Sequence, residues 1–227
     1  MRTRARVTAL LAVAAPLAAA ASASAAKPPT VAMMVVGKTR TLMAARSVAL
    51  KGNSIKIGRR RCTVAAGTAL AGLIDARLKP RVTNVAGCDP ASMFVNKIGP
   101  DANRGIAGWE YKVGHASPSP SAGDPGGRLR AGQQLVWFWC TRASACQGTL
   151  ALSVSGNRLS AATRVTVTGY DDNGHGTRIA GATVHVDSTT AATGADGTAT
   201  VLLTPGRHTL FATKTGLVQS FPTVVTR

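Results

Sequence analysis

The chain has 227 residues and is strongly basic, with 27 lysines and arginines against nine aspartates and glutamates and a formal net charge of +18 at pH 7. Its one basic cluster is "RRR" at 59–61, and no helical pattern gathers lysines and arginines on one face. The composition therefore argues against specific nucleic-acid recognition. Two interpretations remain: attraction to an anionic partner such as a wall polymer or lipid headgroups, and a basic composition without a specific partner.

The first 26 residues have the pattern of a signal peptide. "MRTRAR" is a basic start, an apolar run follows over 7–21, and "SASAA" offers small-residue sites for cleavage after Ala25 or Ala26. No later segment approaches the length of a transmembrane helix. We therefore expect an exported protein, soluble or associated with the cell envelope, that keeps a net charge of +15 after losing three arginines. The alternative is retention of the first segment as an anchor.

In the expected first domain, residues 27–148, short strands are predicted at 30–36, 54–58, 81–87 and 92–99 because β-branched runs are bounded there by Gly, Pro or Asn. One segment, 66–78, instead has apolar residues at helical spacing, with Thr68 or Gly67 near its start and Pro80 after its end. A single helix among strands predicts a small α+β domain in which the helix packs over a sheet.

Two further strands are predicted within 108–140. "WEYKV" and "QLVWFWC" flank a loop rich in Gly, Pro and Ser, which favours a hairpin-like pair. In the second strand, Leu135, Trp137 and Trp139 share one face, and Val136 and Phe138 share the other. Since both faces are apolar, the strand is expected at the centre of a sheet.

Residues 38–148 resemble the domain of unknown function 4430, a family similar to the β-rich C-terminal domain of transcobalamin. The resemblance is carried by "GWEYKVG" and "GGRLRAGQQLVWFWC", with the helix "GTALAGLIDA" and the strand "VNKIG" upstream. It implies a fold and an extracellular location rather than an activity. Vitamin binding is not implied, because transcobalamin also relies on a helical barrel domain that this chain does not contain.

Four cysteines lie after the predicted signal peptide, at Cys62, Cys88, Cys140 and Cys146. An even number in an exported chain indicates two disulfides, for which three pairings exist. Cys62–Cys88 and Cys140–Cys146 are favoured because each closes a local loop. A zinc site is the alternative, but the spacing lacks Cys-x2–4-Cys and no histidine lies close by, so no metal is expected.

The expected second domain, residues 149–227, is predicted to be an immunoglobulin-like β-sandwich of six or seven strands. Its segments "IAGATV" and "AATGADGTATVLLTPGRHTLFAT" resemble bacterial immunoglobulin-like and carboxypeptidase-regulatory-like modules. The overall fold class is thus mainly β. Strands are expected at regular spacing, over 150–156, 164–170, 182–186, 197–203, 207–213 and 221–226.

One stretch of this domain, "GHGTRIAG" at 174–181, resembles the segment around the catalytic histidine of subtilisin-like proteases. Such an enzyme also needs a serine nucleophile and an orienting acid. The nearest string to the serine motif, "GTALAG" at 67–72, has Ala69 at the nucleophile position, and no Asp-Thr/Ser-Gly segment occurs. We therefore expect His175 to lie in a turn, where Gly174 and Gly176 supply positive φ.

No other pattern indicates catalysis, a cofactor or a metal. Glu110 is the sole glutamate, and the eight aspartates are dispersed, so a glycosidase-type pair is not indicated. "DDNG" at 171–174, with Asp187 and Asp196, lacks calcium-loop spacing, which favours an Asx-type turn. The histidines lack paired spacing, and His185 and His208 are expected as surface or packed side chains in strands.

The aromatic residues Trp109, Tyr111, Trp137 and Trp139 allow two interpretations: a solvent-facing platform that stacks on sugar rings or apolar ligands, or the domain core. The sequence as a whole predicts an exported, non-catalytic binding or adhesion protein of the cell envelope, with an anionic wall polymer or polysaccharide as partner. The alternatives are a structural spacer, and an enzyme with an unrecognised site that would gather Asp124, His115 and Glu110.

Overall fold

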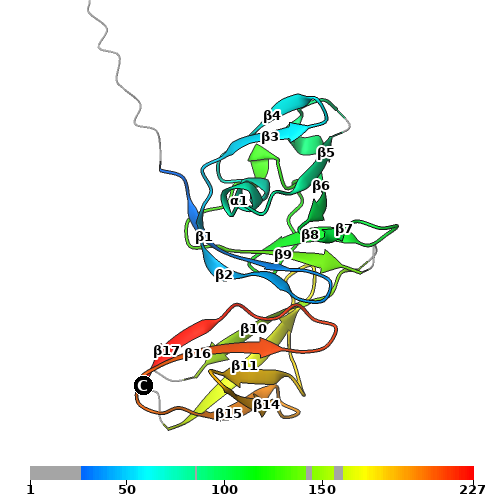
Figure 1. Ribbon diagram of the computed structural model, residues 1–227. Coiled ribbons are helices and arrows are strands. Elements are labelled where there is room, and N and C mark those ends of the chain that lie inside the picture. Colours follow the sequence, from blue (N-terminus) through cyan, green and yellow to red (C-terminus); the bar gives the residue numbers. More distant parts are fainter. Residues whose placement is uncertain (1–26, 85, 142–144, 156–160) are drawn as a thin grey trace, which may run out of the picture.

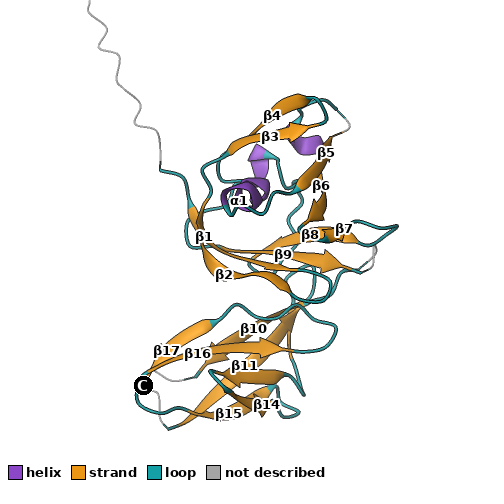
Figure 2. Ribbon diagram, viewed as in Figure 1, coloured by secondary structure: helices purple, strands orange, loops and turns teal. Residues whose placement is uncertain are grey.

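The computed structural model describes residues 27–84, 86–141, 145–155 and 161–227 (Figure 1). The predicted signal peptide, residues 1–26, lies outside the described residues. The described chain is mainly β, with one α-helix (Figure 2), as the sequence predicts.

A four-stranded mixed sheet forms the centre of the N-terminal part. Its order is β2–β1–β9–β8, with β1 and β9 parallel and the two outer pairs antiparallel. Every residue of β9 from Leu135 to Cys140 is buried, which explains the absence of polar alternation in this strand. The central position expected for this strand is confirmed. The strands are β1 (Thr30–Val36), β2 (Thr41–Ala49), β8 (Gly108–Val113) and β9 (Gln134–Cys140).

Helix α1 (Ala69–Asp75) packs on one face of this sheet. Its N-cap is Thr68, whose hydroxyl accepts a hydrogen bond from the Ala71 amide at 3.2 Å. Gly72 allows the close approach, because a Cβ there would lie only 3.0 Å from the Met33 sulfur and 3.1 Å from a Leu135 methyl group. The helix is shorter than the predicted 66–78.

The helix ends early because the chain closes a Schellman turn at its C-terminus. The Arg77 amide donates to the Ile74 carbonyl at 2.9 Å, and the Leu78 amide donates to the Leu73 carbonyl at 3.0 Å. Arg77 takes the left-handed conformation, with φ of 63°, at the position where glycine is usual.

A hairpin and a small sheet complete the N-terminal part. The hairpin of β3 and β4 lies at the end of the molecule away from the C-terminal part (Figure 1). The small antiparallel sheet has the order β5–β6–β7. These elements are β3 (Asn53–Ile57), β4 (Arg60–Val64), β5 (Arg81–Asn84), η1 (Pro90–Ser92), β6 (Met93–Ile98), β7 (Asp101–Ala102) and, before β9, η2 (Pro125–Gly127).

The C-terminal part contains two four-stranded sheets. One hydrophobic cluster draws residues from both sheets, including Leu150, Val165, Val184 and Leu210, so the sheets enclose a common core. The first sheet holds β10 (Thr149–Val154), β11 (Ala162–Tyr170), β12 (Gly176–Arg178) and β15 (Thr198–Leu202). The second holds β13 (Thr183–Val186), β14 (Thr189–Ala192), β16 (Arg207–Thr213) and β17 (Thr223–Thr226).

A third, smaller cluster joins the two parts. Met34, Val136 and Phe138 lie on the face of the central sheet opposite α1 and pack with Val218 of the C-terminal part. The Gln219 amide contacts the Met34 sulfur at 3.4 Å beside this cluster. The second apolar face of β9 is therefore covered by the C-terminal part.

Candidate anion-binding surface

The three tryptophans that the sequence offered as a platform belong to the core. Trp109, Trp137 and Trp139 are only 2%, 1% and 3% exposed. Trp109 and Trp139 pack edge to face at 5.8 Å, and the indole N–H of Trp109 donates to the Asp101 carbonyl at 2.8 Å. A solvent-facing platform of these rings is therefore wrong, because β8 and β9 turn them toward α1 and the core cluster.

The fourth aromatic, Tyr111, is half-buried beside Trp137, with ring centroids 5.1 Å apart. Its hydroxyl donates to the Pro120 carbonyl at 2.7 Å, so the polar end of the ring is occupied by the proline-rich loop. Burial, followed by the charges of Asp124 and Glu110, raises the pKa of Tyr111 to about 12. The Tyr111 side chain therefore anchors the loop around Pro120 and is not a solvent-facing ring for stacking on a ligand.

The subtilase-like stretch forms a structural turn. The Asp171 carboxylate accepts hydrogen bonds from the amides of Asn173 at 2.9 Å and His175 at 2.8 Å, an Asx-type turn. Gly174 has the expected positive φ of 81°. Gly176 does not have a positive φ. It is the first residue of β12 and pairs with Tyr170 in the sheet, which requires extended backbone, so the expectation for this glycine is wrong.

The remaining acids and histidines are each engaged locally. His208 lies between the Asp187 carboxylate at 2.7 Å and the Thr204 carbonyl at 2.8 Å. Asp196 accepts from Thr198 and pairs with Arg164. Among the described residues, no three His, Cys, Asp or Glu side chains are grouped so as to hold a metal ion.

The three residues of the alternative enzyme site also have separate roles. Asp124 caps η2 by accepting from the Gly126 amide at 2.7 Å. His115 stacks on Tyr170 at a centroid distance of 4.0 Å. Glu110 lies opposite Phe138 in the β8–β9 ladder, where partial desolvation and then the charge of Asp172 raise its pKa.

The basic charge is concentrated in the N-terminal part. Residues 27–148 contain 18 lysines and arginines and five acids, a net charge of +13, whereas residues 149–227 contain six and four, a net charge of +2. Among the described residues, only one ion pair involves a cation of the N-terminal part, Lys112 with Asp172. The other described cations of this part thus have no carboxylate partner within ion-pair distance.

The densest group of these cations lies on the hairpin of β3 and β4. Lys56 and Arg61 are cross-strand partners, Arg59 lies in the turn, and Arg60 begins β4. All four side chains are exposed. We call these four residues the basic hairpin. Their Cα positions follow from the two-residue turn at Gly58 and Arg59, in which Gly58 has φ of 60°.

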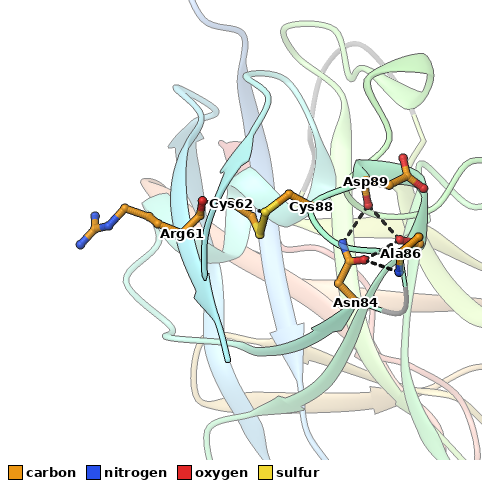
Figure 3. The surroundings of a disulfide bond; sticks show 7 residues. Arg61, Cys62, Asn84, Ala86, Cys88 and Asp89 are labelled. Atoms are coloured by element: carbon orange, nitrogen blue, oxygen red, sulfur yellow. Dashed lines mark hydrogen bonds between the residues drawn. A yellow bond between two sulfur atoms is a disulfide. The ribbon is translucent and has the colours of Figure 1, made fainter. Parts of the chain in front are cut away.

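The Cys62–Cys88 disulfide fixes the basic hairpin to the segment after β5 (Figure 3). Cys62 follows Arg61 in β4 and points inward, while the Arg61 side chain points away from the disulfide. On the other side, the Asn84 amide donates to the Asp89 carbonyl at 2.9 Å, and the Asn84 oxygen accepts from the Ala86 amide at 2.9 Å. The second bond, Cys140–Cys146, completes the pairing that the sequence favoured.

This arrangement presents several cations on a rigid support without internal neutralisation. The face of the hairpin with Ile55, Ile57, Cys62 and Val64 packs against the core, so the opposite face, with Lys56 and Arg61, has a defined position. Arg60 pairs with Ile57, and its guanidinium lies beside Gly87 at the edge of the hairpin. Clustered cations of this kind attract and hold anions. The triplet at 59–61 was visible in the sequence, whereas the pairing of Lys56 with Arg61 needed the hairpin register.

In the described part of the chain, no helix has the length and apolar character needed to cross a bilayer. Comparison of the sequence with family models and with curated proteins, and of the fold with solved structures, finds no match.

Proposed function

We propose that this protein is an exported, non-catalytic binding protein of the cell envelope that holds an anionic wall polymer through its basic hairpin. The single observation that carries the proposal is the placement of the charge: +13 in the N-terminal part against +2 in the C-terminal part, with four exposed cations on one disulfide-fixed hairpin. Two disulfides and the signal-peptide pattern support an extracytoplasmic location.

A polymer suits this surface better than a small ligand. The hairpin cations are exposed at one end of the molecule (Figure 1), where each single contact is weak because water and salt screen it. Many repeated contacts along one chain overcome this weakness through effective concentration. The mutual repulsion of Lys56, Arg59, Arg60 and Arg61 is also relieved when a polyanion lies across them.

The C-terminal sandwich supports the role of a spacer in this proposal. It carries little net charge, and its contact with the N-terminal part covers the face of the central sheet opposite α1. The basic hairpin lies at the far end of the N-terminal part (Figure 1), so the sandwich leaves it accessible. The domain resemblances of both halves remain predictions from the sequence.

The test is binding of residues 27–227 to immobilised poly(glycerol phosphate), with uncharged dextran as the control matrix. We expect retention at 20 mM salt, and log Kd rising in proportion to log salt concentration. Retention equal on both matrices would contradict the proposal. Binding to vesicles of anionic lipid that exceeds binding to the polymer would contradict it as well, because the partner would then be a membrane surface.

A further inference from the structure

A second basic feature lies at the C-terminal end of α1. There, β2 and the end of the helix border an open hollow of about 380 Å³, lined by Arg46, Lys51, Asp75 and Arg77 together with Ala76 and residues 47–49. We call it the α1 hollow. Its volume lies in the range of small-ligand sites, and three of its four charged side chains are cations.

Hydrogen bonds fix the walls of the α1 hollow. The Arg46 guanidinium donates to the Ala76 carbonyl at 3.0 Å, which also neutralises the partial negative charge of the helix end. The Lys51 amide donates to the Asp75 carboxylate at 2.8 Å. Arg46, Lys51 and Asp75 thus come from a strand, the loop after it and the helix. Among the described residues, the Lys51 ammonium has no carboxylate within ion-pair distance.

Arg77 occupies this wall at a cost in conformational energy. Its φ of 63° is the left-handed region, which disfavours residues with a Cβ and which glycine fills at most helix C-termini. Backbone strain of this kind is the starting point for a functional hypothesis only where the side chain also lies at a site, and Arg77 lines the hollow. An arginine at this lining position can supply a guanidinium to a ligand in the hollow, which a glycine cannot.

We infer that the α1 hollow binds a phosphate group. Asp75 offsets one of the three positive charges, which leaves two, and these match the two negative charges of inorganic phosphate or a terminal phosphomonoester. Arginine guanidinium groups donate in a fork that matches phosphate oxygens. A carboxylate ligand fits less well, because it carries one charge and the hollow already contains one carboxylate.

The inference rests on the proposed function and extends it from the basic hairpin to the α1 hollow. Its test uses inorganic phosphate, so its failure leaves the hairpin proposal standing. The key variants are R77G and K79G. Lys79 is the matched control, because it too is a cation with positive φ, at 48°, but it does not line the hollow. Both substitutions remove one charge and relieve one left-handed side chain.

Calorimetric titration with inorganic phosphate at constant ionic strength measures the phosphate affinity of the R77G and K79G variants. We expect R77G to weaken phosphate binding at least about tenfold, from the loss of a charge-assisted hydrogen bond, and K79G to change it by less than about twofold. Both variants should melt at or above the wild-type temperature, so the lost binding cannot be attributed to unfolding. K51Q, which removes a cation that is exposed and lines the hollow, should also weaken binding.

Two arms distinguish the source of the phosphate. If it is the end of a polymer, R77G weakens binding of poly(glycerol phosphate) that carries a terminal phosphate, but not of polymer from which a phosphatase has removed it. If it is free phosphate, R77G leaves both polymers unaffected. Equal loss of phosphate binding in R77G and K79G, or no loss in either, would overturn the inference.

Discussion

The Lys112 ammonium, on a side chain with no exposed surface, lies 2.9 Å from the Asp172 carboxylate across the junction of the two parts. It also donates to the Asp171 carbonyl at 3.1 Å and lies over the Phe138 ring at 5.9 Å. The Ser117 amide donates to the Asp172 carbonyl at 2.8 Å beside it. The turn that precedes the protease-like stretch therefore holds a buried lysine of the N-terminal part.

Replacing Asp172 and replacing Lys112 should reduce the stability of the folded protein by unequal amounts. D172N leaves a fully buried ammonium without its counter-charge, and we expect a loss of about 3 kcal/mol of stability. K112M keeps the packing of the stem. It leaves an Asp172 side chain that is 36% exposed, so the carboxylate can be hydrated at its other oxygen although Oδ1 is buried, and a loss of about 1 kcal/mol is expected. Urea unfolding of both variants measures the difference; equal losses would show that burial does not govern this pair.

His208 should make stability fall at alkaline pH. Both ring nitrogens face acceptors, so the imidazolium form is favoured, and the hydrogen bonds to Asp187 and then to Thr204 raise its pKa above 6.5. A raised folded pKa gives stability that is full below pH 6.5 and is lost as pH rises through the folded pKa. H208Q should flatten the profile of melting temperature between pH 6.5 and 8; an unchanged slope would contradict the assignment.

His115 should make stability fall at acidic pH, the opposite of the effect of His208. Burial, followed by the charge of Lys112, lowers its pKa from 6.5. Its contribution is therefore present above pH 6.5 and lost as pH falls through the lowered folded pKa. H115F keeps a ring against Tyr170 and has no proton to take up. The variant should lose less stability than wild type between pH 6.5 and 5, as followed by thermal melting at each pH.

The two disulfides should contribute unequally to stability. Cys62–Cys88 spans 26 residues and Cys140–Cys146 spans six, so loop-closure entropy assigns about 3–4 kcal/mol to the first and about 2 kcal/mol to the second. C62A/C88A should also weaken polymer binding, because the basic hairpin loses its anchor, whereas C140A/C146A should not. Denaturant unfolding and the poly(glycerol phosphate) assay check the two parts of this prediction.

The strands with strong β-branched or aromatic patterns were predictable from the sequence. Thr30–Val36 and Arg207–Thr213 match the predicted ranges, and the apolar faces of β9 indicated its central position. Strand β2 was missed because Ala44, Ala45 and Arg46 interrupt its apolar pattern at the edge of the sheet. The short strands β12 and β14 lack a buried face and were missed for the same reason.

The candidate site was predictable only in part. The arginine triplet stands out in the sequence, but the α1 hollow joins Arg46 to Arg77 across 31 positions, and no local pattern connects them. The aromatic platform was wrong because the alternation of β8 and β9 does not reveal which face receives the helix. Only the packed structure shows that the tryptophans face inward.

The central claim is tested most directly by a charge-matched comparison of poly(glycerol phosphate) binding. One variant removes the basic hairpin (K56Q/R59Q/R60Q/R61Q), and the other removes four exposed arginines elsewhere (R104Q/R130Q/R178Q/R207Q). Both lower the net charge by four. The account predicts that the hairpin variant loses more than about tenfold in affinity at 100 mM salt and the other less than about threefold. Equal losses in the two variants would contradict it, because net charge alone would then explain the binding.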